Sequence, residues 1–105
     1  MVSLNSVLSA IARPYAEFGG RKLFPRIEQK AAALVEALAG RNHGFVDGNK
    51  RTAFICMNIL LNNSGYGLSD AVTNAAVEEM MVAVAEGRLP TRPLTSWFKS
   101  RIVKI

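Results

Sequence analysis

The chain has 105 residues and a formal net charge of +5, a length that suits one compact domain and is too short for two. Half of its residues are hydrophobic, which excludes a disordered chain. The single cysteine, Cys56, excludes an intrachain disulfide framework and a multi-cysteine zinc site, and with no visible signal segment we expect a cytoplasmic protein. Charged or amide residues interrupt every apolar run well before about 18 residues, so we expect no membrane span.

The positive charge is unevenly distributed. Residues 1–87 carry eight basic and eight acidic side chains, whereas residues 88–105 carry five basic side chains and no acidic one. Such a surplus at one end is more typical of a solvated tail, or of a surface that faces an acidic partner, than of a nucleic-acid-binding domain. Nucleic acid is therefore not an expected partner.

Helices rather than strands are expected along the whole chain, because apolar residues recur mostly every three or four positions and alanine occurs fourteen times. A first helix is predicted over 3–12, ending before Pro14, since proline pushes the preceding residue out of helical geometry. Residues 14–23, with Gly19 and Gly20, predict a loop or a small hairpin. Pro25 suits the first turn of the next helix, which Gly40 ends.

Residues 49–63 predict a helix without a polar face. Between Ala53 and Leu61 only Asn58 is polar, so we expect this helix to be central and buried, with the other helices around it.

The last third predicts two further helices. The first is capped by Ser69 or Asp70 and runs to about Glu86, where Gly87 closes it. An extended link over 88–95 then leads to a short final helix over Trp97, Phe98 and Ile102. The predicted fold is a single all-α domain over 1–105, with four or five helices.

The candidate binding and catalytic residues lie in the segment 41–52. Gly48 and Asn49 open a helix, whose free N–H groups and dipole favour an anion, and Lys50 and Arg51 in the first turn oppose that dipole unless a phosphate compensates. Asp47 is a carboxylate beside this site, and Mg²⁺ is commonly held by one or two carboxylates plus substrate phosphates.

The only histidine, His43, lies just ahead of these residues. An imidazole has an unperturbed pKa near 6.5, so at neutral pH it can take a proton from an attacking hydroxyl. Together the segment predicts transfer of a phosphate-containing group.

Each of these features also has an ordinary explanation. A loop histidine is commonly a surface residue, Asp47-Gly48-Asn49 is a usual turn and helix-cap sequence, and Lys50 and Arg51 could be solvated charges. The P-loop pattern is not met, because Lys50 does not directly follow a glycine. The joint occurrence of these residues at fixed spacing favours the functional interpretation.

At these residues the sequence resembles the Fic/Doc family. The family motif, His-x-Phe-x-Asp/Glu-Gly-Asn-Gly/Lys-Arg, is matched without a gap by His43, Phe45, Asp47, Gly48, Asn49, Lys50 and Arg51. Beyond the motif, the helix before it, the apolar helix after it and the run from Val84 to Leu89 look like the Doc (death-on-curing) branch.

The resemblance implies a role for each motif residue. His43 would be the general base that activates a target hydroxyl, Asp47 would bind magnesium, and Gly48, Asn49, Lys50 and Arg51 would contact the phosphates of ATP. It also implies that residues 14–23 correspond to a flap that aligns the target by strand-like pairing, although an ordinary connector explains them equally well.

The residue at position 50 separates two activities in the family. Members that transfer AMP usually have glycine there, whereas the Doc branch carries lysine, which is associated with transfer of the γ-phosphate. Phe54 stands where many AMP-transferring members have a second arginine. Both features imply a Doc-like protein kinase, with a translation elongation factor as target; the alternatives are an AMP or other nucleotidyl transferase, and an inactive Fic-fold module.

The resemblance also predicts partners and a departure from the family. The nearest candidate for the self-inhibitory motif, residues 82–87, has valine where serine or threonine is required, which suits a toxin neutralised by a separate, Phd-like antitoxin. Doc-like proteins usually have a further helix ahead of the stretch that residues 4–14 resemble, so the N-terminus is expected to be shortened. Loss of a packing helix would expose apolar surface and favour self-association.

Overall fold

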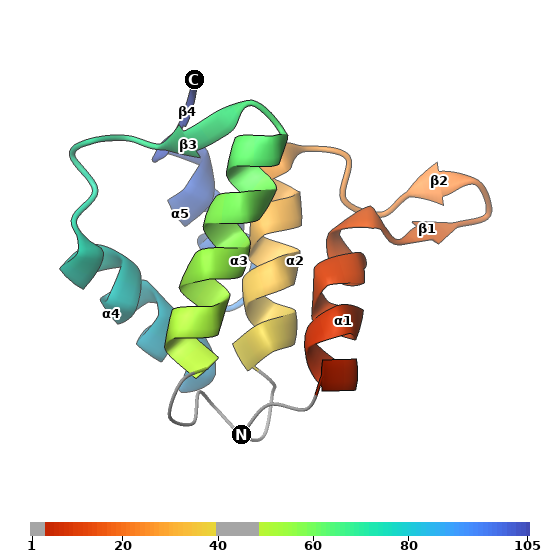
Figure 1. The fold of residues 1–105 in the computed structure, drawn as a ribbon, viewed down its shortest axis with the longest axis horizontal. Coiled ribbons are helices and arrows are strands. Elements are labelled where there is room, and N and C mark those ends of the chain that lie inside the picture. Colours follow the sequence, from red (N-terminus) through yellow and green to blue (C-terminus); the bar gives the residue numbers. More distant parts are fainter. Residues whose placement is uncertain (1–3, 40–48) are drawn as a thin grey trace.

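A computed structural model describes residues 4–39 and 49–105, which form five α-helices, a one-turn 3₁₀ helix and two pairs of short strands. The elements are α1 (Leu4–Ala12), η1 (Arg13–Tyr15), β1 (Glu17–Phe18), β2 (Arg21–Lys22), α2 (Ile27–Ala39), α3 (Asn49–Asn63), β3 (Tyr66–Leu68), α4 (Asn74–Ala85), α5 (Thr91–Lys99) and β4 (Ile102–Lys104). The chain is therefore all-α, as predicted (Figure 1).

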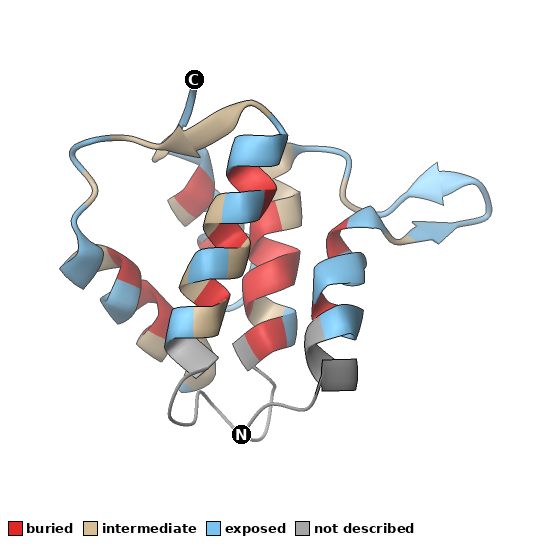
Figure 2. Cartoon of the chain, in the orientation of Figure 1, coloured by how far each residue is buried: buried red, intermediate tan, exposed pale blue. Residues whose placement is uncertain are grey.

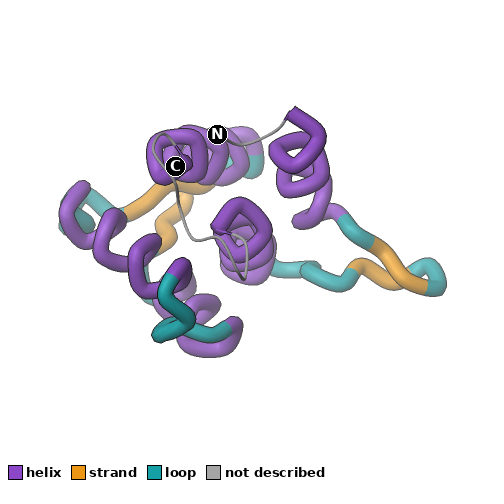
Figure 3. Tube along the Cα trace, turned by 90° about the horizontal axis from the view of Figure 1, so that it is seen from below, coloured by secondary structure: helices purple, strands orange, loops and turns teal. Residues whose placement is uncertain are grey.

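The central helix is α2, and the prediction that residues 49–63 occupy the centre was wrong. Residues 31–35 of α2 are all buried, and α2 packs against α1, α3, α4 and α5. Viewed along its axis it lies in the middle of the other helices (Figure 3). Three consecutive alanines, Ala31–Ala33, let neighbours approach it closely. By contrast, Ile55 and Ile59 of α3 are 50% and 53% exposed, so an apolar composition did not mean burial on every side (Figure 2).

The hydrophobic core joins the inner faces of the helices. It includes Leu34 and Val35 of α2, Met57 and Leu61 of α3, and Met81 of α4. At the C-terminal side of the core, Phe98 is fully buried and contacts the half-buried Trp97 edge-on at a ring-centroid distance of 5.1 Å.

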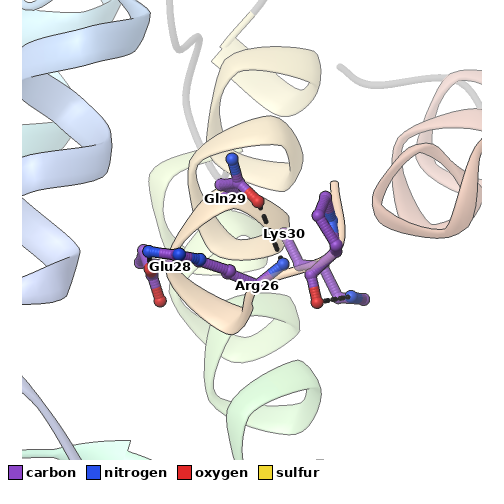
Figure 4. A network of polar contacts seen from close by, with 5 residues as sticks. Arg26, Glu28, Gln29 and Lys30 are labelled. Carbon is purple, nitrogen blue, oxygen red and sulfur yellow. Dashed lines mark hydrogen bonds and ion pairs between the residues drawn. The ribbon is translucent and has the colours of Figure 1, made fainter. Parts of the chain in front are cut away.

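Polar contacts hold the start of α2 in place. The side-chain oxygen Oε1 of Gln29 accepts a hydrogen bond from the backbone N–H of Arg26 at 3.0 Å, which satisfies a donor that the helix leaves free (Figure 4). Lys30 Nζ donates to the carbonyls of Phe24 and Pro25 at 2.6 and 3.1 Å. Burial, with a smaller contribution from nearby Lys22, lowers the pKa of Lys30. These bonds fix the path of the chain between the hairpin and the start of α2.

Of the loop or small hairpin expected over residues 14–23, the structure forms a hairpin over residues 17–22, after the 3₁₀ helix that includes Pro14 and Tyr15. Glu17 pairs with Lys22 and Phe18 with Arg21, and the N–H of Leu23 donates to the carbonyl of Ala16 at 3.0 Å. The hairpin extends away from the helices (Figure 1). The two turn residues, Gly19 and Gly20, have φ of 59° and 81°, the geometry of a type I′ turn, which matches the twist of paired strands.

Replacing Gly19 should show how far the hairpin depends on this turn. We expect Gly19→Val to destabilise the hairpin by about 1–2 kcal/mol, because a β-branched side chain disfavours positive φ. Gly19→Asn should leave the stability of the hairpin nearly unchanged. Amide hydrogen exchange at Leu23 measures the change. Equal protection of Leu23 in the valine and asparagine variants would show that the turn conformation does not limit hairpin formation.

The end of α4 agrees with the prediction and its start does not. Gly87 has φ of +76°, its N–H donates to Val84 and the N–H of Arg88 donates to Ala83, which is a Schellman cap. The helix begins at Asn74 with Thr73 as its cap, rather than at Ser69 or Asp70. The reason is that Ser69–Val72 forms a separate turn, closed by Val72 N–H donating to the Ser69 carbonyl.

The C-terminal region differs most from the prediction. Helix α5 begins at Thr91, inside the predicted extended link, because Pro93 falls in its first turn, where a missing N–H costs little. Ile102 lies in β4 rather than in the last helix. Strand β4 pairs with β3, Gly67 opposite Val103, and neither strand was predicted.

Candidate functional site

The end of α2 and the start of α3 lie at the same end of the helical bundle (Figure 1). Helix α2 runs toward this end and stops at Ala39, and α3 starts there at Asn49 and returns alongside α2 (Figure 1). His43, Asp47 and Gly48 lie outside the residues that the structure describes. For Asn49 and Lys50 the backbone is described, as the first two residues of α3. The predicted start of this helix is therefore confirmed.

Helix α3 is anchored by one face, and this fixes the direction of its first turn. Ala53 and Met57 are fully buried, followed by Leu60 and Leu61, at the three-to-four spacing of a helix side that packs against α2. Ala53 is only two residues beyond Arg51, so the helix is held in the core within its first turns. The first-turn N–H groups accordingly occupy a set position at the end of the bundle.

Arg51 is the one predicted site residue whose side chain the structure describes. It is exposed, and it makes no ion pair with another described residue. No acidic residue lies in the first turn of α3, although carboxylates are the groups that the positive end of a helix dipole favours. The described part of the site is thus cationic and open to solvent, which suits an anionic ligand such as a phosphate group.

The neighbouring residues of α3 support the helix rather than the chemistry. Phe54 is half-buried against the core, and its carbonyl accepts a hydrogen bond from Asn58 Nδ2 at 3.1 Å. Burial raises the pKa of the Cys56 thiol, so this cysteine stays protonated at neutral pH and lacks the reactivity of a thiolate.

A separate cleft of about 740 Å³ lies between α2 and the segment that joins α4 to α5. Among the described residues it is lined by Phe24, Ala33, Leu89 and Pro90, together with two charged residues, Arg13 and Glu36. The Arg13 guanidinium lies over the Phe24 ring at 5.0 Å, and Glu36 Oε2 accepts a hydrogen bond from Thr91 at 2.8 Å. Sequence reasoning missed this cleft, because its walls come from segments far apart in the chain.

No described helix combines the length and the apolar character that crossing a membrane requires.

Comparison with known proteins agrees with the motif. The sequence profile described as "Fic/DOC family" matches residues 2–61, which include α1, the hairpin, α2 and most of α3. A protein of Mycolicibacterium smegmatis named "Toxin Doc" is 43% identical over 77 residues, which is 73% of this chain and 58% of that protein. The chain therefore matches little more than half the length of this relative. No solved structure matches the chain significantly.

Proposed function

Because the chain belongs to the Fic/DOC family, we propose that it acts as a Doc-type toxin, a protein kinase that transfers the γ-phosphoryl group of ATP to a hydroxyl group of a target protein. The observation that carries the proposal is the complete motif from His43 to Arg51, whose last three residues are the first three of α3. The similarity to a protein named "Toxin Doc" supports the choice of branch.

The described residues fit a nucleotide. A helix start with an exposed Arg51 and no acidic residue in its first turn is suited to phosphate oxygens. In this proposal Gly48, Asn49, Lys50 and Arg51 hold the ATP phosphates, and Asp47 holds Mg²⁺. ATP bound in this way supplies the phosphoryl group and Mg²⁺ offsets its negative charge.

The remaining chemistry belongs to His43 and the target. His43 takes the proton of the target hydroxyl as its oxygen attacks the γ-phosphorus, the bond between that phosphorus and the β,γ-bridging oxygen breaks, and ADP leaves. The β1–β2 hairpin is the proposed flap that aligns the target segment. A translation elongation factor as the target and a Phd-like antitoxin as the inhibitor complete the proposal.

The position of the transferred label tests the reaction. ATP labelled at either the α- or the γ-phosphate is added with the purified chain to a cell extract, and labelled proteins are separated. We expect γ label on one protein and no α label. Transfer of α label would instead indicate a nucleotidyl transferase, and transfer of neither label would indicate an inactive Fic-fold protein.

Lys50 is expected to decide which phosphate is transferred. In the proposal its side chain occupies the space that an α-phosphate would need, so Lys50→Gly should lower γ-phosphate transfer by about tenfold or more, because the nucleotide is no longer held in the reactive orientation. Lys50→Arg, which keeps the bulk and the charge, is the control and should retain most of the activity. Full γ transfer by the glycine variant would contradict this account of Lys50.

A further inference from the structure

The outward side of α5 carries positive charge that no described residue balances. Helix α5 buries Leu94 and Phe98 completely, and the opposite side presents Arg92, Ser96 and Lys99, spaced four and three residues apart and all exposed. Arg101 follows in the turn after the helix. We call Arg92, Ser96, Lys99 and Arg101 the basic stripe.

The basic residues of this region differ in their surroundings. Arg88 is paired, since its Nη2 lies 2.7 Å from Glu86 Oε1 and its Nε donates to the same oxygen at 2.9 Å. Arg92, Lys99 and Arg101 form no ion pair with any residue in 4–39 or 49–105. Arg92 also lies in the first turn of α5, where the helix dipole disfavours a cation and no acidic residue is present. This placement costs stability unless an external anionic group compensates.

The guanidinium of Arg101 is held in position by contacts with neighbouring residues. Its guanidinium lies over the Trp97 ring at 4.5 Å, and its Nη1 donates to the Trp97 carbonyl and to Ser100 Oγ, both at 3.1 Å. A guanidinium fixed in this way loses less conformational entropy when it binds a carboxylate in a bidentate manner. The stripe therefore combines a preorganised arginine with two exposed cations.

We propose that the basic stripe of α5 docks an acidic segment of a partner polypeptide. The argument is charge complementarity. Arg92, Lys99 and the Ser96 hydroxyl, a donor, lie along about 10 Å of helix, and Arg101 follows in the turn beyond it. None of these three cations forms an ion pair with a described residue. Carboxylate side chains of one short segment can reach both Arg92 and Lys99, which lie seven residues apart on one side of the helix. The proposal does not depend on the reaction proposed for the motif, because the stripe contains none of its residues.

An acidic polypeptide fits the stripe better than a nucleic acid does. Binding to duplex DNA depends mainly on how many phosphates the protein neutralises, and the stripe with Lys104 on β4 supplies four basic side chains. Binding to single strands relies on aromatic rings on which bases stack. Here the face of Trp97 is already covered by Arg101.

Binding of defined probes to the full chain tests the proposal. The probes are fluorescein-labelled peptides of alternating Glu and Ser, the same peptide with Gln in place of Glu, and a DNA duplex, each followed by fluorescence anisotropy at low and high salt. We expect the Glu peptide to bind, more weakly at high salt, and the Gln peptide not to bind.

Two charge-matched double variants locate the binding surface. Arg92→Glu/Lys99→Glu should weaken binding of the Glu peptide by at least about tenfold. Arg21→Glu/Lys22→Glu makes the same change in net charge on the hairpin, at the other side of the molecule (Figure 1), and should leave binding within about twofold. All four side chains are exposed, so both variants should fold.

Three outcomes would overturn the proposal. Equal weakening by the two double variants would mean that only net charge matters. Equal binding of the Gln and Glu peptides would show that carboxylates are not recognised. Tighter binding of DNA than of the Glu peptide, with the same dependence on Arg92 and Lys99, would make the stripe a nucleic-acid surface instead.

Discussion

The variant His43→Ala is expected to transfer phosphate to the target protein about 10²- to 10⁴-fold more slowly than the native chain, the usual contribution of a positioned general base. Without the imidazole, the attacking hydroxyl keeps its proton until it reacts with the γ-phosphate. The rate is measured as γ label incorporated into the target protein per unit time. Residual activity above about a tenth of the native rate would show that His43 is not the base.

Cys56→Ala is a matched control for this experiment. Cys56 lies on α3, near the motif in sequence, but burial raises the pKa of its thiol and it packs against the core. The variant should therefore keep nearly full activity. Circular dichroism of both variants checks that helix content is retained, so that a loss seen only in His43→Ala reports on the chemistry.

Phe98→Ala is expected to have the largest effect on stability, about 3–5 kcal/mol in the free energy of unfolding. Phe98 is fully buried on α5, in the cluster that joins α5 to the other helices, and its removal leaves a cavity that the rigid neighbours fill only in part. Because the free energy of unfolding of a small domain is only about 5–15 kcal/mol, we expect this variant to lose a large share of it. Urea unfolding followed by circular dichroism measures it.

Ile59→Ala provides the comparison for Phe98→Ala. Ile59 is also an apolar residue on a helix, but it is 53% exposed, and alanine has the higher helix propensity. The change in unfolding free energy should stay within about 0.5 kcal/mol. A smaller loss for Phe98→Ala than for Ile59→Ala would mean that α5 does not belong to the cooperative core.

The helices and their ends were predictable wherever local sequence decides them. The end of α1 at Ala12 follows from Pro14, and the end of α4 at Ala85 follows from the left-handed Gly87, because the effects of both residues extend over only a few positions. The β1–β2 hairpin was one of two expected forms, the other being a loop, and the two adjacent glycines at its turn favour it. At the site, the start of α3 was predicted from the turn sequence ahead of it.

Features that depend on distant segments were not predictable. Pairing of β3 with β4 joins residues 66–68 to 102–104, and neither segment is long enough to show an alternating pattern. The central position of α2 depends on which faces of the other helices meet it, whereas apolar content alone pointed to α3. The extended link predicted over 88–95 was wrong, because Pro93 lies in the first turn of α5, where proline is tolerated.

The contact between Arg101 and Trp97 also provides an internal optical probe. Trp97 is the only tryptophan of the chain, it contacts Phe98 on the buried side, and the guanidinium of Arg101 covers its ring. Its emission therefore depends on both the integrity of the core and the position of one cation of the basic stripe. Intrinsic fluorescence of the unlabelled native chain can thus follow unfolding and ligand binding at α5 without any engineered dye.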